Sequence, residues 1–113
     1  EEATFKPHAG CRHVHACVDA TQALLNNHRF KLDDITSIEI YSYKEAITPS
    51  FRVNYEPQSV GQAGFSLPVT VSVVLTQGNW YREAIETYDS PEARRLRHLV
   101  KVGLTSRKSR LWN

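Results

Sequence analysis

The residues best suited to chemistry gather near the amino end, in the stretch FKPHAGCRHVHAC at positions 5–17. It brings together histidines, cysteines and one arginine: His8, Cys11, Arg12, His13, His15 and Cys17. Side chains of these types could bind a metal ion, form a disulfide, or line an active site for an anionic substrate. Each site would belong to a different kind of protein, so the spacing has to be weighed for each.

A disulfide between the two cysteines is the less favoured state of these thiols. Small domains that depend on disulfides usually carry four or more cysteines, and this chain has two. A bridge from Cys11 to Cys17 across a helix start would also need unusual backbone geometry. Two free thiols are therefore expected.

A zinc centre needs about four ligands that converge on one point. If a helix begins near His13, then His13 and Cys17 share a face, while His15 points about 200° away from His13. At most His13, Cys17 and one loop residue could converge. A metal-binding protein that uses Cys11, His13 and Cys17 is thus the weakest hypothesis, and no metal site is predicted.

An anion site uses the same residues differently. A helix that starts after Gly10 presents free N–H groups and a partial positive charge. Arg12 adds a planar fork suited to a carboxylate or phosphate, and histidines can transfer protons near neutral pH. The plainer alternative stays open, because a helical histidine usually only packs or forms a hydrogen bond, and Arg12 could pair with Asp19.

The elements that must position these residues follow from hydrophobic periodicity. An amphipathic helix is predicted from about His13 to Asn26, and a half-buried strand from Ser37 to Tyr43. Residues 46–57 have the composition of a loop. Ser59 with Gln62 three positions later is typical of a helix start, and the following segment to Gln77 is apolar on nearly all sides. It should be buried, and its β-branched residues would suit a strand as well as a helix.

The last predicted helix begins at Ser90 and Pro91, with an inner stripe of Leu96, Leu99 and Val100. One clear strand is too few for a stable sheet. Further strands are expected near residues 80–85 and 102–104, or the pairing comes from another chain or from sequence outside this chain.

Composition is that of one ordinary globular domain. The chain has 113 residues, of which 41% are hydrophobic and 23% charged, and a formal net charge of +2. That charge is too small to indicate nucleic-acid binding, and no apolar run is long enough to span a bilayer. No signal peptide is recognisable at the amino end. We expect a soluble, cytoplasmic α+β protein with helices on a short, incomplete sheet.

Two motifs together resemble the MmgE/PrpD family. The first is Lys6-Pro7-x-x-x-Cys11-Arg12-His13-x-His15-x-x-x-Asp19-Ala20, and the second is AGFSLPVTVSVVLTQG at positions 63–78. They lie about fifty residues apart with a predicted strand between them, as in the family. The family includes 2-methylcitrate dehydratases, cis-aconitate decarboxylase and iminodisuccinate epimerase.

The resemblance implies a particular architecture. Family members have a large helical domain and a smaller α+β lid domain, with the active site between them. The resemblance covers residues 5–104, and residues 1–104 are interpreted as part of the C-terminal lid domain. Residues 105–113 form a basic tail that the motifs leave unmatched. The chain would then be a lid fragment or stand-alone lid domain, inactive alone, or a non-catalytic binding or oligomerisation module derived from it.

The resemblance also implies roles for individual residues. His15 falls at the family's catalytic histidine, and four residues would bind substrate: Lys6, Arg12, His13 and Ser66. A tyrosine commonly follows the family's Ser-Leu-Pro, whereas this chain has Val69, which removes a hydroxyl. Alternatively, Ser66 and Pro68 only shape a helix kink. No cofactor is implied. The expected partners are a small polycarboxylate substrate and either a helical-domain chain or a second copy, with no nucleic acid and no membrane.

Overall fold

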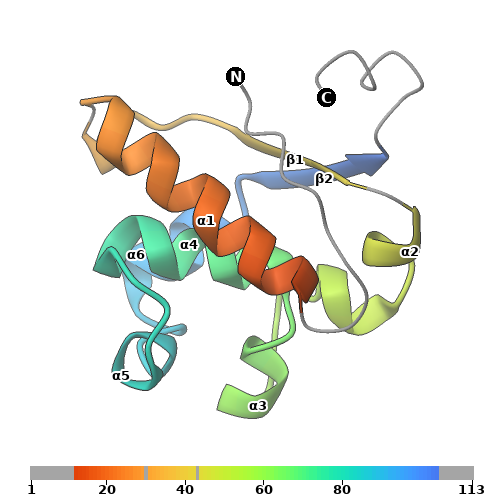
Figure 1. Cartoon of the computed structure of the whole chain (residues 1–113). Helices are drawn as coiled ribbons and strands as arrows, with labels where there is room; N and C mark the ends of the chain where they lie inside the picture. The colour runs from red at the N-terminus through yellow and green to blue at the C-terminus, as the bar shows by residue number, and fades with distance from the viewer. Residues whose placement is uncertain (1–11, 30, 43, 105–113) are drawn as a thin grey trace.

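The computed structural model describes residues 12–29, 31–42 and 44–104 (Figure 1). Two parallel strands and a set of helices make up this part of the chain. The helices are α1 (Arg12–Asn27), α2 (Lys44–Ile47), α3 (Val60–Ala63), α4 (Leu67–Gln77), α5 (Arg82–Ile85) and α6 (Pro91–Arg97). The strands are β1 (Ile38–Ser42) and β2 (Val100–Leu104), and short 3₁₀ turns cover Leu32–Asp34 and Ser50–Val53.

The sheet consists of β1 and β2, paired in parallel with Ile38 opposite Val100 and Ser42 opposite Leu104. In β1, Ile40 and Ser42 are buried while Glu39 and Tyr41 are exposed, which confirms the predicted half-buried strand. The strand expected near residues 102–104 is also present, as β2. The strand expected near residues 80–85 is wrong, because α5 occupies this place.

The physical reason for α5 is local. The side chain of Asn79 accepts a hydrogen bond from the backbone N–H of Tyr81 at 2.9 Å, which turns the chain just before the helix. Ala84 is then buried against α4, in a cluster with Val69 and Val73. A single helical turn satisfies both contacts, whereas an extended segment would carry Ala84 away from that cluster.

Helix α1 packs one face onto the core, as predicted from its periodicity. Val14, Cys17, Val18 and Thr21 are buried, at the spacing i, i+3, i+4, i+7 that defines one face of a helix. The Thr21 hydroxyl donates to the Cys17 carbonyl oxygen at 2.8 Å, so this buried polar group is paired inside the helix. The helix begins and ends within one residue of the predicted 13–26.

The apolar segment that periodicity could not assign to a helix or a strand forms the helix α4. Nine consecutive residues, Leu67 to Leu75, are buried. The expected kink does not form, because the chain leaves α3 after Ala63 and starts a new helix with Ser66 as its N-cap. Pro68 therefore lies in the first turn, where a helix needs no N–H donor. Gly78 ends the helix with a φ of 81°, a conformation that favours glycine.

Two other helix starts agree with the sequence. The Ser59 hydroxyl accepts the Gln62 N–H at 3.1 Å at the start of α3, and the Ser90 hydroxyl accepts the Ala93 N–H at 3.2 Å at the start of α6. Helix α6 is shorter than predicted, because Val100 leaves the helical stripe and enters β2, where it remains buried.

The result is an α+β fold with helices on a small sheet, as expected. Buried side chains of α1, α4, α6 and both strands form one core cluster, with α4 in contact with both α1 and α6. Within the described ranges, no helix combines the length and apolar character needed to cross a bilayer.

Candidate active site

His15, the residue predicted to be catalytic, lies on α1 with its side chain exposed. It is next to Val14, which is buried, so the helix holds His15 on a rigid element while its ring faces solvent. Arg12 and His13 lie in the first turn of the same helix, but their side chains are outside the described part of the structure. Lys6 lies outside the described residues altogether.

Helices α1 and α4 run in the same general direction, so the first turns of both helices lie at one end of the molecule (Figure 1). The Gln22 amide donates to the Gly78 carbonyl oxygen at 3.2 Å, which joins the later part of α1 to the far end of α4. Val14 and Leu67, from the early parts of the two helices, belong to the same core cluster. The fold therefore brings the beginnings of the two helices to the same end of the molecule.

Ser66, predicted to bind substrate, is fully buried in the structure. Its hydroxyl donates to the Asn54 carbonyl oxygen at 2.7 Å and accepts the Val69 N–H at 3.3 Å. One oxygen thus caps α4 and also ties the 50–54 turn to the helix start. In this conformation the hydroxyl serves as the cap of α4 and as a donor to the preceding turn.

An aromatic pair flanks the start of α4. Phe65 precedes the cap and packs edge-to-face against Phe51, with ring centroids 5.9 Å apart and planes at 76°. The two residues are 49% and 47% exposed, respectively. The guanidinium carbon of Arg52, whose side chain is buried, lies 5.3 Å from the Phe51 centroid. This end of the molecule therefore presents apolar aromatic surface close to the second motif.

Cys17 is a core residue. It is a free thiol, 1% exposed, and burial raises its pKa to about 12, although a hydrogen bond with Thr21 acts weakly in the other direction. Among the described residues no three His, Cys, Asp or Glu side chains could hold a metal ion together. Cys11, the other thiol, lies outside them.

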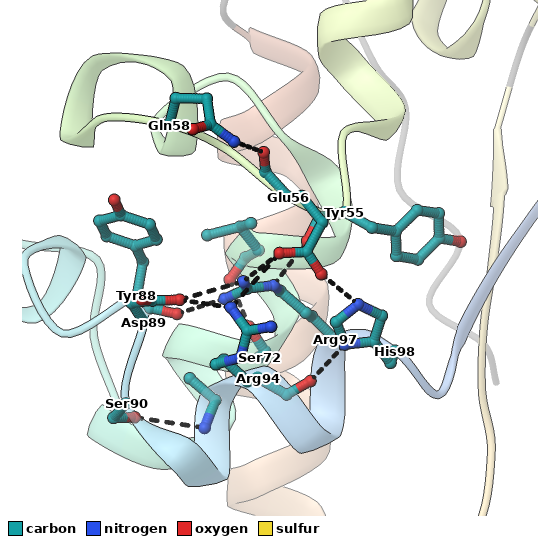
Figure 2. A network of polar contacts seen from close by, with 12 residues as sticks. Tyr55, Glu56, Gln58, Ser72, Tyr88, Asp89, Ser90, Arg94, Arg97 and His98 are labelled. Carbon is teal, nitrogen blue, oxygen red and sulfur yellow. Dashed lines mark hydrogen bonds and ion pairs between the residues drawn. The ribbon is translucent and has the colours of Figure 1, made fainter.

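A second polar cluster, which the sequence did not reveal, is built around the buried side chain of Arg97 (Figure 2). Its Nε donates to the Tyr55 carbonyl oxygen at 2.7 Å and its Nη1 to the Tyr88 carbonyl oxygen at 2.6 Å. Its Nη2 faces Glu56 and Asp89, at 3.4 and 3.2 Å. The Arg97 guanidinium thus connects α6 to the residues just before it, Tyr88 and Asp89, and to the segment around Tyr55, which is distant in sequence.

Arg94 and His98 complete this network. Arg94 pairs with Asp89 at 2.8 Å and with Glu56 at 3.3 Å, and the His98 ring contacts the other oxygen of Glu56. Partial burial opposes ionisation of Glu56, but Arg94, His98 and Arg97 outweigh it and lower its pKa. Hydrogen bonds from Arg94 and Arg97 likewise lower the pKa of Asp89. Every charge in this cluster has a partner within the chain, which indicates a structural network.

Comparison with known families identifies the chain. The model of the MmgE/PrpD C-terminal domain matches residues 8–110, which is nearly the whole sequence. The chain belongs to the MmgE/PrpD family. The match runs past residue 104 into the tail that the two motifs leave unmatched. No curated protein and no solved structure matches the chain.

Membership in the MmgE/PrpD family makes the position of Val69 informative. The resemblance of the second motif to the family implies a tyrosine at this position. Here the Val69 side chain is fully buried, in a cluster with Ala63, Val73 and Ala84. The position faces the interior between α3, α4 and α5, so neither a hydroxyl nor an exposed surface is present there.

The sequence did not predict the role of Arg97, because two of its partners are backbone carbonyl groups, which any residue type carries. A signal was present nevertheless: Ala93, Leu96, Arg97 and Val100 recur at helical spacing, and three of them are apolar. An arginine in an apolar stripe either extends its guanidinium into water or is buried with partners, and the structure shows the second arrangement for Arg97.

Proposed function

We propose that this chain is a lid-domain piece of an MmgE/PrpD-type lyase or isomerase that acts on small polycarboxylates, of the 2-methylcitrate dehydratase kind. The observation that carries the proposal is the position of His15. It is exposed on α1, at the end of the molecule where both α1 and α4 begin. Family membership supports this reading of the histidine.

Each residue of the first motif has a role in this proposal. Dehydration, decarboxylation or epimerisation beside a carboxylate requires neutralisation of negative charge and transfer of a proton. His15 transfers the proton. Lys6, Arg12 and His13 bind the carboxylates, helped by the partial positive charge at the start of a 16-residue helix. No metal or organic cofactor enters the proposal.

The second motif contributes support rather than chemistry. Ser66 orients the start of α4 and the 50–54 turn, so its effect on substrate is through backbone position. The remaining active-site groups would come from a large helical domain. The half-exposed pair Phe51 and Phe65 is apolar surface of the kind that such a partner would cover. The chain alone should therefore show little or no turnover.

The direct experiment is an assay of 2-methylcitrate dehydration and cis-aconitate decarboxylation. The chain is tested alone and together with the separately expressed helical domain of a 2-methylcitrate dehydratase. We expect activity only in the mixture, lost in His15→Gln and kept in His28→Gln, which changes another exposed histidine outside the motif. Robust turnover by the isolated chain would contradict the fragment proposal, and equal loss in both variants would contradict the role of His15.

The second candidate is a stand-alone binding or oligomerisation module derived from the lid. Val69 favours it, because the hydroxyl common at this position in the family is replaced by a buried aliphatic side chain. Isothermal titration with citrate and light scattering separate the two candidates. A module without catalysis would assemble or bind citrate, yet stay inactive with any helical domain.

A further inference from the structure

Among residues 12–29, 31–42 and 44–104, no strand pairs with the outer edge of β1. Within the described residues the sheet has only two strands, and β1 pairs with β2 along one side. Ile38 donates its N–H to the Leu99 carbonyl oxygen at 3.2 Å, toward β2. Because backbone groups alternate along a strand, Glu39 and Tyr41 direct their N–H and C=O groups away from β2. Figure 1 shows the two strands side by side above α1.

This edge has few of the features that usually protect an edge strand. Natural edges are blocked by proline, lysine, bulges or a covering loop, and β1 reads Ile-Glu-Ile-Tyr-Ser. The outer side of β2 differs, because the Tyr55 hydroxyl donates to the Val100 carbonyl oxygen there at 2.6 Å. The two edges of the sheet are thus unequal, and β1 is the one suited to further pairing.

Apolar surface adjoins the same edge. A groove of about 260 Å³ is lined by α1, α4, the segment before β1 and the start of β1 itself, with no residue from β2. Leu24, on its rim, is 45% exposed. Exposed apolar surface beside an unpaired strand is typical of a place where another chain packs.

We propose that β1 pairs antiparallel with β1 of a second copy of this chain, about a two-fold axis through Ile40. In this register Glu39 lies opposite the partner's Tyr41, and both residues have outward backbone groups to exchange. Ile40 meets its own counterpart on the buried face. The proposal goes beyond the lid function and does not depend on it.

The side chains of β1 favour this register, and they favour a second copy of the chain as the partner at the strand edge. A shift that placed Glu39 opposite its counterpart would set like charges across the strands, which is unfavourable. Glu39 beside a tyrosine is favourable, and the pair already forms within one chain, where the Tyr41 hydroxyl donates to Glu39 at 2.9 Å. The strand is therefore self-complementary, as a two-fold interface requires.

Two substitutions at one position give the test. Tyr41→Glu places a glutamate opposite the partner's Glu39, whereas Tyr41→Lys places a lysine there. Both remove the ring that covers Gly103, where an added Cβ would lie 3.3 Å from the ring, so their effects on the monomer are matched. Sedimentation velocity over a concentration series measures the dimer dissociation constant of each full chain.

We expect a dimer for the unmodified chain and a dissociation constant about tenfold higher for Tyr41→Glu than for Tyr41→Lys. Hydrogen exchange on the unmodified chain should show the Glu39 and Tyr41 amides protected at high concentration and exposed on dilution. A monomer at all concentrations overturns the proposal. So does a dimer in which both variants bind alike, or one in which these amides exchange freely.

Discussion

The two family motifs lie on helices of opposite character. Helix α1 buries one face and leaves His15 in solvent, whereas α4 is buried over Leu67 to Leu75. On α4 the side-chain oxygens of Ser66, Thr70 and Ser72 each bond to a backbone carbonyl. The difference indicates that one matched segment can present a candidate site while the other contributes to the core that supports it. In the first motif the described histidine, His15, faces outward, whereas most of the second motif is buried in the core.

This comparison predicts that changes on the α4–α6 side reduce stability and that changes at the start of α1 reduce only function. The largest effect should come from Arg97→Met. Removal of a fully buried guanidinium leaves the Tyr55 and Tyr88 carbonyl oxygens without their donor, which should lower the free energy of unfolding by about 3 kcal/mol. Urea unfolding followed by circular dichroism measures it.

Arg82→Met is the matched control for Arg97→Met. Arg82 is an exposed residue that pairs only with Glu86 one helical turn away, so its loss should change the free energy of unfolding by less than about 0.5 kcal/mol. If the two variants lose equal stability, the Arg97 cluster is not a structural network.

A smaller effect is expected from Ser66→Ala. Loss of the cap and of the bond to the Asn54 carbonyl should cost about 1–2 kcal/mol of stability. His15→Ala should leave the same quantity within about 0.5 kcal/mol, because its side chain is exposed. Thermal and urea unfolding of both variants test the contrast. If Ser66→Ala does not lower the free energy of unfolding, Ser66 is not needed for stability and a role in substrate binding is favoured.

The smallest expected effect is a loss of stability at acidic pH. The pKa values of Glu56 and Asp89 are lower in the folded state than their ordinary values of 4.5 and 3.8. Their contribution to stability is therefore complete above the ordinary values and is lost as the pH falls through the lowered ones. Unfolding free energy measured across this range should fall less steeply in the double variant Glu56→Gln, Asp89→Asn. An unchanged slope would mean that these carboxylates do not stabilise the fold.

Much of the fold could be predicted because it depends on local patterns. The spacing of Val14, Cys17 and Val18 gives α1, the alternation around Ile40 gives β1, and serines at 59 and 90 mark helix starts. Helix α4 remained ambiguous because a segment buried on all sides loses its periodicity. The end of α6 was misplaced because Val100 suits either a helical stripe or a strand, and only its pairing with Ile38 decides.

The site was less predictable for a similar reason. That His15 is exposed follows from the apolar face of α1, which turns the neighbouring positions outward. The role of Ser66 depends on the Asn54 carbonyl, and that of Arg97 on Tyr55 and Tyr88, none of which shares a local pattern with its partner. The helical spacing around Arg97 indicates that the arginine is buried, but it does not indicate which carbonyl groups it binds.

The most direct test of the account is a titration of the isotopically labelled chain with 2-methylcitrate, followed by NMR. We expect concentration-dependent, saturable shifts of the His15 ring and of amides in the first turn of α1, with the buried residues of α4 unchanged. His28 serves as the internal reference. Shifts confined to α4, or equal small shifts at His15 and His28 without saturation, would contradict the claim that the first motif alone retains the chemistry.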